Sequence, residues 1–127
     1  MSGGTDSDLL LGGFGKDRLA GGEGGDKLLG FVGADRLAGG AGNDLLIGGS
    51  GADVFVFAPG DGVDKVKGFA DGLDRLDLSG YAFAKVGAAL RHFSDVDGGV
   101  LFVAGSDTVF VTGITLADLT WADLLLH

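Results

Sequence analysis

The chain lacks cysteine, has a single proline, and carries nine basic residues against 18 acidic ones in a length of 127. Without cysteine it forms no disulfide and no thiolate zinc site, so an exported form would need another stabiliser, such as a bound metal ion. The net charge of −9 argues against nucleic acid as a partner, because nucleic acids bind basic surfaces. No run approaches the roughly 18 apolar residues that a membrane-spanning helix requires.

Common catalytic motifs are missing as well. The only histidines, His92 and His127, are too far apart for H-E-x-x-H, and no P-loop occurs. Residues 48–52 read G-G-S-G-A, which lacks the last glycine of G-x-S-x-G. We therefore expect a domain that is not an enzyme, with catalysis as the rival interpretation.

What the chain does have is an aspartate at every ninth residue of its first half. Residues 3–56 form six tandem copies of G-G-x-G-x-D-x-(apolar)-x. The aspartates are Asp8, Asp17, Asp26, Asp35, Asp44 and Asp53. The apolar residues are Leu10, Leu19, Leu28, Leu37, Leu46 and Phe55. Tandem nonapeptides of this kind are typical of parallel β-helices that bind calcium.

The spacing of the repeat has a physical explanation. Three residues, x-(apolar)-x, suffice for a short strand whose middle side chain points inward. The other six must reverse the chain, which glycine permits because it tolerates positive φ and close backbone approach. Calcium takes about 6–8 oxygen ligands from carboxylates and carbonyls, and one turn offers about half of them. Two turns must therefore share each ion.

A second periodicity of 18 residues indicates that one full coil contains two strands and two turns. Alternate units end in alanine or in a larger apolar residue, so turns of alternate units should stack on opposite sides. We expect one calcium row at Asp8, Asp26 and Asp44, and the other at Asp17, Asp35 and Asp53. The supporting turn carbonyls are those of Gly12, Gly13, Gly15, Gly21, Gly22, Gly24, Gly30, Gly33, Gly39, Gly40, Gly42, Gly48, Gly49 and Gly51.

Composition favours a folded, metal-binding repeat. Seventeen of the 18 acidic residues are aspartate, which suits tight turns better than glutamate does. The apolar content of 46% is too high for a solvated linker. A disordered linker and a repeat that binds no calcium remain the alternatives.

The repeat loosens after residue 56 but does not stop. Residues 62–66 and 72–76 keep G-x-D-x-(apolar), so we assign 3–79 to the roll, with regular repeats in 3–56 and degenerate rungs in 57–79. Asp64 and Asp74 are expected to continue the rows. Asp61 and Asp71 lie in enlarged turns, where they are either terminal calcium ligands or ordinary turn residues.

Residues 80–127 change character and should cap the open end of the roll. Apolar residues at 83, 86, 90 and 93 predict a short amphipathic helix. Residues 100–103 and 108–111 predict a β-hairpin, 115–118 a capping box that opens a helical turn, and 121–127 a last strand. The cap either covers the row of Leu11, Leu29 and Ile47 or leaves it exposed as a contact patch.

The repeats, residues 52–57 (ADVFVF) and residues 74–79 (DRLDLS) together resemble the C-terminal regions of RTX (repeats-in-toxin) proteins. Similar regions occur in serralysin-type metalloproteases, bacterial lipases and the R-modules of alginate epimerases. The resemblance implies an all-β fold, a right-handed parallel β-roll with calcium between successive turns. It also implies secretion through a type I (ABC-transporter) apparatus that reads an uncleaved C-terminal signal. Asp123-Leu124-Leu125-Leu126 is similar to such signals, although it also fits a buried last strand.

The expected function is a calcium-binding module, holding roughly 4–7 ions, that folds on meeting extracellular calcium. Residues 1–6 show no secretory leader, so we expect the C-terminal secretion and folding domain of a longer exported protein, covalently linked to an N-terminal catalytic domain. The alternative is an accessory module that binds acidic polysaccharide. Its basic side chains would come from Lys16, Arg18, Lys27, Arg36, Lys65 and Lys67.

Two units depart from the repeat pattern. Asp6 replaces the glycine at position 4 of the first unit, so Asp8 is expected to complete only one site. Phe31 replaces the second glycine of the fourth unit, which predicts either a weaker ion site or a turn that bends differently.

Overall fold

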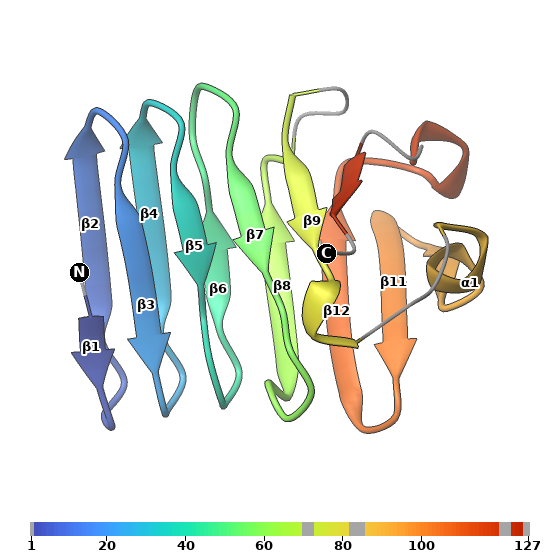
Figure 1. Ribbon diagram of the computed structural model, residues 1–127, viewed down its shortest axis with the longest axis horizontal. Coiled ribbons are helices and arrows are strands. Elements are labelled where there is room, and N and C mark those ends of the chain that lie inside the picture. Colours follow the sequence, from blue (N-terminus) through green and yellow to red (C-terminus); the bar gives the residue numbers. More distant parts are fainter. Residues whose placement is uncertain (1, 70–72, 82–85, 120–122, 126–127) are drawn as a thin grey trace.

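Two sheets of mainly parallel strands face each other along the roll (Figure 1). The computed structural model describes residues 2–69, 73–81, 86–119 and 123–125. In spatial order, the six-stranded sheet consists of β1 (Ser2–Gly4), β3 (Arg18–Gly22), β5 (Arg36–Ala38), β7 (Val54–Val56), β9 (Arg75–Asp77) and β13 (Leu124–Leu125). The seven-stranded sheet consists of β10 (Phe93–Val96), β11 (Gly99–Ala104), β12 (Asp107–Thr112), β8 (Val63–Lys67), β6 (Leu45–Ile47), β4 (Lys27–Val32) and β2 (Leu9–Phe14). The described helices are all too short or too polar to cross a membrane.

Each regular coil takes 18 residues, as the repeat predicts. The register pairs Leu10 with Leu28 and Leu28 with Leu46 in one sheet, and Leu19 with Leu37 in the other. These side chains point between the sheets and are at most 3% exposed. The apolar position of the repeat therefore forms the core, and the expected parallel β-roll is confirmed.

The C-terminal segment extends the seven-stranded sheet at its edge and leaves the outer face of the roll open. Strands β11 and β12 form the expected antiparallel hairpin, and β12 lies parallel to β8. Leu11 consequently remains 46% exposed, while Leu29 and Ile47 are half-buried. Only Leu11 of this row is exposed, so neither alternative holds for the whole row.

The helix expected around residues 83–93 is only partly correct. The described helix α1 spans Val86–Leu90, and residues 82–85 lie outside the described residues. Phe93 begins the unpredicted strand β10 instead. Its buried ring packs 4.9 Å from that of Phe102, so tertiary packing overrides the helical spacing of the apolar residues.

The remaining short elements agree with the sequence. The helix η2 (Leu116–Asp118) begins at a capping box, in which the Thr115 N–H and hydroxyl both donate to the Asp118 carboxylate. Strand β13 pairs with β9 and is the expected last strand, although residues 121, 122, 126 and 127 lie outside the described part. A further 3-10 helix, η1 (Ser79–Tyr81), which was not predicted, follows β9.

Asp107, at the start of β12, ties the cap to the turn between β7 and β8. Its carboxylate accepts hydrogen bonds from the N–H groups of Gly60 (3.0 Å) and Gly62 (3.1 Å) and from the Tyr81 hydroxyl (2.9 Å). Burial raises the pKa of Asp107, but these three hydrogen bonds outweigh it and the net pKa is lowered. The carboxylate thus stays charged and holds three segments together.

Candidate metal centre

The aspartates of the repeat form two stacked rows, one on each side of the roll where the turns lie. In each row, the backbone N–H of one aspartate donates to the Oδ1 atom of the aspartate in the next coil, at 2.7–3.0 Å. The rows are Asp8-Asp26-Asp44-Asp64 and Asp17-Asp35-Asp53-Asp74. The structure therefore brings together eight of the ten aspartates that the sequence singles out.

The second carboxylate oxygen of these rows is buried and has no partner. Among the described residues, the buried side-chain oxygens without a hydrogen bond are the Oδ2 atoms of Asp8, Asp17, Asp26, Asp35, Asp44 and Asp53. One such atom lies in each nonapeptide unit. Leaving a buried acceptor unpaired costs about 1–3 kcal/mol, and more when the group is charged. Six of them in so short a chain indicate a partner of positive charge.

The first glycine of each unit leaves open the space beside this oxygen. A Cβ atom at Gly12 would lie 2.9 Å from Asp17 Oδ2 and 2.8 Å from the carbonyl oxygen of Gly30 in the next coil. The same pair of oxygens lies beside Gly3, Gly21 and Gly30. A carboxylate and a carbonyl from adjacent coils therefore converge on a space that any other residue would fill.

Positions 2 and 4 of the regular units take positive φ angles, except at position 4 of the first unit, where Asp6 does not. The glycines there have φ between +84° and +127°, which other residues rarely adopt. Phe31, at position 2, follows them with φ of +73°, and its ring is 43% exposed. The turn keeps its bend, so the different bend expected from this substitution is not observed.

Burial raises the pKa of three row aspartates, Asp44, Asp53 and Asp64. The pKa of Asp44 and of Asp53 rises to about 6, and that of Asp64 to about 8. Burial is the largest cause in each case, and the negative charges of neighbouring aspartates add to it. Backbone N–H donors lower these pKa values without cancelling the rise. A divalent cation in the row would favour the ionised forms.

Asp61, in the first enlarged turn, lies outside the ladder of the rows. Asp61 accepts the N–H of Ala58 through Oδ2 at 2.8 Å, which is a local turn contact. Its charge nevertheless raises the pKa of Asp44 and of Asp64, so it lies near the end of that row. Asp71 lies outside the described residues.

The oxygen set fits a hard cation held largely by carbonyl groups. In the part of the chain that the structure describes, three or more His, Cys, Asp or Glu side chains nowhere converge into a side-chain metal site. A site between two coils would instead combine row carboxylates with turn carbonyls. Such an all-oxygen set suits calcium, which takes about 6–8 ligands in flexible geometry.

Comparison with known proteins leads to the same metal. A model of the RTX calcium-binding nonapeptide repeat, in four copies, matches residues 1–28 and 29–66. The chain belongs to this RTX family. RTX nonapeptide repeats bind calcium, and RTX repeat domains are typically non-catalytic modules. Comparison with curated proteins gives no match.

Solved structures of other RTX modules resemble the chain closely. The AlgE6R3 and AlgE6R2 subunits of the Azotobacter vinelandii mannuronan C5-epimerase are 30% and 27% identical to it, with TM-scores of 0.75 and 0.67. They match 98% and 96% of the chain and 80% and 91% of their own lengths. The extracellular lipase LipA of Serratia marcescens shares the fold, with a TM-score of 0.82 at 23% identity over 98% of the chain. The chain spans only 20% of that lipase.

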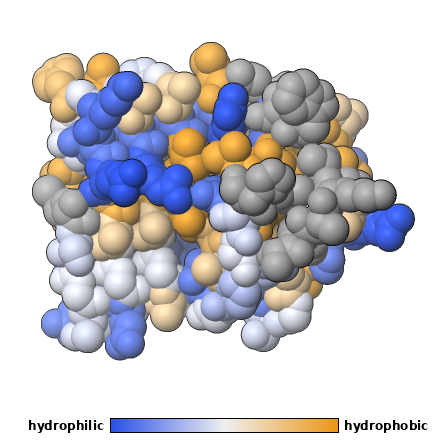
Figure 2. All heavy atoms as spheres, viewed as in Figure 1, coloured by the Kyte–Doolittle hydropathy of each residue, from blue (hydrophilic) through white to orange (hydrophobic). Residues whose placement is uncertain are grey.

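Among the described residues of this RTX roll, basic side chains lie on strands of both sheets. Arg18 and Arg36 are Cα partners on β3 and β5 and therefore stack on adjacent coils, 18 residues apart. Lys27, Lys65 and Lys67 belong to the other sheet. Figure 2 shows a hydrophilic band over the N-terminal strands, next to an apolar area at the centre of the same face.

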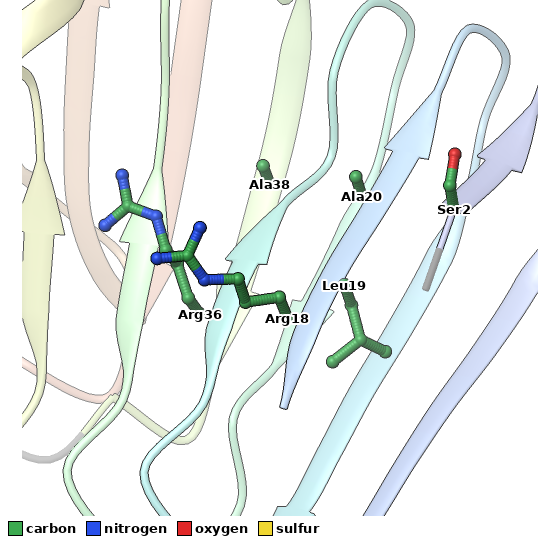
Figure 3. A pocket seen from close by; sticks show the side chains of 6 residues that line it. All are labelled: Ser2, Arg18, Leu19, Ala20, Arg36 and Ala38. Atoms are coloured by element: carbon green, nitrogen blue, oxygen red, sulfur yellow. The ribbon is translucent and has the colours of Figure 1, made fainter. Parts of the chain in front are cut away.

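Arg18 and Arg36 line a surface pocket of about 380 Å³ (Figure 3). The Arg18 side chain extends toward the strand that carries Arg36, and Ala20 and Ala38 lie beside them. The Arg36 guanidinium also pairs with Asp77 at 3.0 Å. Burial raises the pKa of Asp77, but hydrogen bonds from Ser79 and Arg36 outweigh it, so the net pKa is lowered.

Three residues near the site make contacts that the sequence pattern does not predict. Asp107 and Asn43 bond to backbone groups 20 to 47 residues away, and Asp77 pairs with a residue 41 positions away. No local motif predicts such contacts. The Asp77-Leu78-Ser79 segment does carry a signal, because Asp followed two residues later by Ser favours the local turn observed there.

Proposed function

We propose that the chain is a calcium-switched folding module in which Ca²⁺ binds between successive turns of the roll. The observation that carries this proposal is the set of six buried, unpaired Oδ2 atoms, one in each nonapeptide unit. Each belongs to an aspartate whose N–H is bonded to the carboxylate of the next coil, so two coils frame each space. We assign one ion to each space, which gives three ions on each side of the roll.

The proposed ligands are the row aspartates together with turn carbonyls of the glycines at positions 1, 2 and 4. Asp64 and Asp74 close the last space on each side. Asp61 and Asp71 remain proposed terminal ligands. Because aspartate binds the metal in its ionised form, calcium and protons compete for the same groups.

Calcium binding drives folding because the calcium-free roll is poorly stabilised. Several strands contain only three residues, and two rows of like charges run through the structure. Extracellular calcium modules bind at about 10⁻⁴–10⁻³ M, well above cytosolic calcium levels. The chain would thus stay unfolded inside the cell and fold outside, as a secreted domain attached to a catalytic domain.

Far-UV circular dichroism tests the switch directly. We expect a disordered spectrum in EGTA and a β spectrum after addition of millimolar calcium. A complete β spectrum in EGTA would contradict the proposal.

A matched pair of variants tests the row assignment. Asp44→Asn removes one buried row carboxylate, and Asp97→Asn removes an exposed one in the cap. We expect Asp44→Asn to raise the calcium concentration at half-folding severalfold, because a ligand charge is lost, and Asp97→Asn to leave it unchanged. Equal effects of the two variants would refute the rows as ligands.

The same switch suits export through a type I apparatus. Asp123 is 1% exposed and β13 is paired with β9, so a signal in this segment is accessible only before folding. Fusing the chain behind a passenger protein and expressing it with a type I transporter should deliver the passenger to the medium. Deleting residues 123–127 should keep it inside, and undiminished export of that deletion would refute the assignment of the signal.

A polysaccharide-binding role is the second candidate, favoured by the pocket at Arg18 and Arg36 and by the likeness to epimerase subunits. The double variant Arg18→Ala/Arg36→Ala should abolish a mobility shift with alginate. Lys27→Ala/Lys65→Ala, on the other sheet, should not. Absence of any shift for the calcium-loaded chain would eliminate this candidate.

A further inference from the structure

The turns on the two sides of the roll carry different exposed residues. The turns that follow β2, β4 and β6 contain the row of Asp17 and are called the Asp17 side. The turns that follow β1, β3 and β5 contain the row of Asp8 and are called the Asp8 side. The two sides lie at the upper and lower ends of the strands in Figure 1.

Positions 3 and 5 of the regular units vary in sequence, and the residues there are all exposed. On the Asp17 side they are Phe14, Lys16, Val32, Ala34, Ser50 and Ala52. On the Asp8 side they are Thr5, Ser7, Glu23, Gly25, Ala41 and Asn43. Figure 2 likewise shows apolar residues along the upper edge and mainly white and blue ones along the lower edge. Because the Asp8 side forms the same turns with polar residues, the fold does not require apolar ones on the Asp17 side.

Phe31 and Val32 are the centre of an apolar patch on the Asp17 side. They belong to β4, an inner strand between β2 and β6, and are 43% and 47% exposed. Phe14, the Cα partner of Val32, completes the patch. The Phe31 carbonyl accepts the N–H of Ser50 at 2.9 Å, so the next coil holds this turn in place. Neither Phe31 nor Val32 belongs to the core cluster or to the partly buried residues packed against it.

The backbone of Phe31 indicates that its side chain serves a contact outside the roll. In the part of the chain that the structure describes, it is the one residue other than glycine with a positive φ. The other regular units have glycine at this position. A strained residue gains stability when its side chain is buried, and the Phe31 side chain is not. Strain that persists without such a gain is typical of ligand contacts and other functional positions.

The charges exposed beside the patch are positive. In residues 12–18, 30–36 and 48–54, the exposed charged side chains are Lys16 and Arg18. The row carboxylates of Asp35 and Asp53 are at most 1% exposed. An apolar patch flanked by basic side chains complements an anionic lipid surface, which takes apolar groups between its headgroups and attracts the basic ones.

We propose that the Asp17 side docks on the surface of an anionic lipid bilayer, with Phe14, Phe31 and Val32 entering the headgroup region. A stable protein interface buries roughly 800 Å² on each partner, whereas even an aromatic side chain offers only about 150–250 Å². The exposed parts of three side chains are therefore too small for such an interface, but they suffice for a weak, reversible lipid contact. The Asp8 side exposes Asp6 and Glu23, which an anionic surface repels, so the roll docks in one orientation.

Lipid docking goes beyond the proposed calcium switch. It rests on that switch in one respect, because calcium in the row of Asp17 would neutralise the carboxylates behind the patch. The test is co-sedimentation of the whole chain with lipid vesicles in millimolar calcium, after circular dichroism has shown that the chain is folded. We expect saturable binding to vesicles of phosphatidylcholine and phosphatidylglycerol, and much weaker binding to vesicles of phosphatidylcholine alone.

A turn exchange separates lipid contact from loss of folding. The double variant Phe31→Gly/Val32→Ser gives this turn the residues Gly49 and Ser50 of the next coil, which the roll already accommodates. It should bind the anionic vesicles about tenfold more weakly or less, because the exposed fractions of two apolar side chains no longer leave water. Thermal unfolding in calcium should show no loss of stability.

Val103→Ala is the matched control. Val103 is 42% exposed, nearly as much as Phe31, but it lies on β11 in the hairpin. Its replacement should leave vesicle binding unchanged.

Three results would overturn the proposal. The first is a folded chain that does not sediment with anionic vesicles, which would assign the patch to a protein partner. The second is equal binding by the parent and the turn-exchange variant. The third is self-association of the parent that the turn exchange abolishes, which would assign the patch to a second copy of the chain. A chain that does not fold in calcium would instead refute the proposed switch, so the two failures are distinguishable.

Discussion

Gly21 illustrates why the first position of a repeat unit admits no side chain. A Cβ atom there would collide with Asp26 Oδ2 and lie 2.5 Å from the Gly39 carbonyl oxygen. We expect Gly21→Ala to cost about 1–3 kcal/mol of stability in calcium, as overpacking does, and to raise the calcium midpoint. Thermal unfolding at saturating calcium measures the loss.

Gly25→Ala is the matched control for this substitution. Gly25 has no positive φ, and a Cβ atom there meets its nearest neighbour, the Asn43 carbonyl oxygen, at 3.0 Å. The loss should therefore be clearly smaller. Equal losses would show that the space beside the row aspartate is not special.

Phe31 is strained, because it adopts a backbone conformation that only glycine adopts without a steric cost. Its φ of +73° lies in the left-handed region, which costs a residue with a side chain roughly 1–2 kcal/mol. We expect Phe31→Gly to stabilise the calcium-loaded roll by about 1 kcal/mol, measured by denaturant unfolding.

Val32→Gly, at the next position, is the control for Phe31→Gly. Val32 does not have a positive φ, so glycine there relieves no strain and only adds flexibility to the unfolded chain. It should destabilise the roll. Stabilisation by both substitutions would argue that removing exposed apolar surface, rather than relieving strain, is the cause.

At the scale of elements, the cap depends on contacts that no periodicity reveals. The hairpin, the capping box and the last strand follow from local patterns, and all three are present. Phe93 instead joins a strand because its ring packs on Phe102, a contact between residues nine positions apart. The side-by-side placement of β12 and β8 brings residues 63 and 108 together, which local sequence does not specify.

Asp107 tests whether the cap must be fixed to the roll for folding. Asp107→Ala would leave the N–H groups of Gly60 and Gly62 and the Tyr81 hydroxyl without their acceptor. We expect a loss of about 4 kcal/mol or more and a higher calcium midpoint, because three hydrogen bonds to a charged group are lost and each is worth about 1.5–3 kcal/mol. Tyr81→Phe removes only one of the three bonds to Asp107 and should cost about 1.5–3 kcal/mol. A calcium midpoint unchanged by Asp107→Ala would mean that the roll folds independently of its cap.

At the scale of the whole molecule, the nonapeptide period specifies the coil, the inward ladder of leucines and the two rows of aspartates. These features follow because every unit repeats the same sequence pattern, so the conformation of one unit predicts that of all the others. The irregular end of the roll has no such redundancy. Asp61 therefore forms a local turn bond outside the ladder, whereas Asp64 and Asp74 continue it.

Protonation should partly replace calcium in stabilising the whole roll. Folding raises the pKa of Asp44 and of Asp53 from 3.8 to about 6, and that of Asp64 to about 8, chiefly through burial. At pH values between the unfolded pKa of 3.8 and the raised pKa of the folded state, the folded chain binds more protons than the unfolded chain. The stability of the folded chain therefore falls as pH rises through this range. This contribution is complete below about pH 4 and is lost as pH passes 6, and for Asp64 as it passes 8.

The calcium-free protein is therefore expected to contain more β-structure at pH 5 than at pH 8.5. Circular dichroism in buffers freed of metal by a chelating resin measures this, because the affinity of EGTA for calcium itself depends on pH. At limiting calcium the trend should reverse, since protons displace the ion from its carboxylates. A calcium-free chain that gains β-structure as pH rises would show that the ionised, buried aspartates do not oppose folding. Calcium would then not be needed to neutralise them, which would contradict the proposed calcium-driven folding.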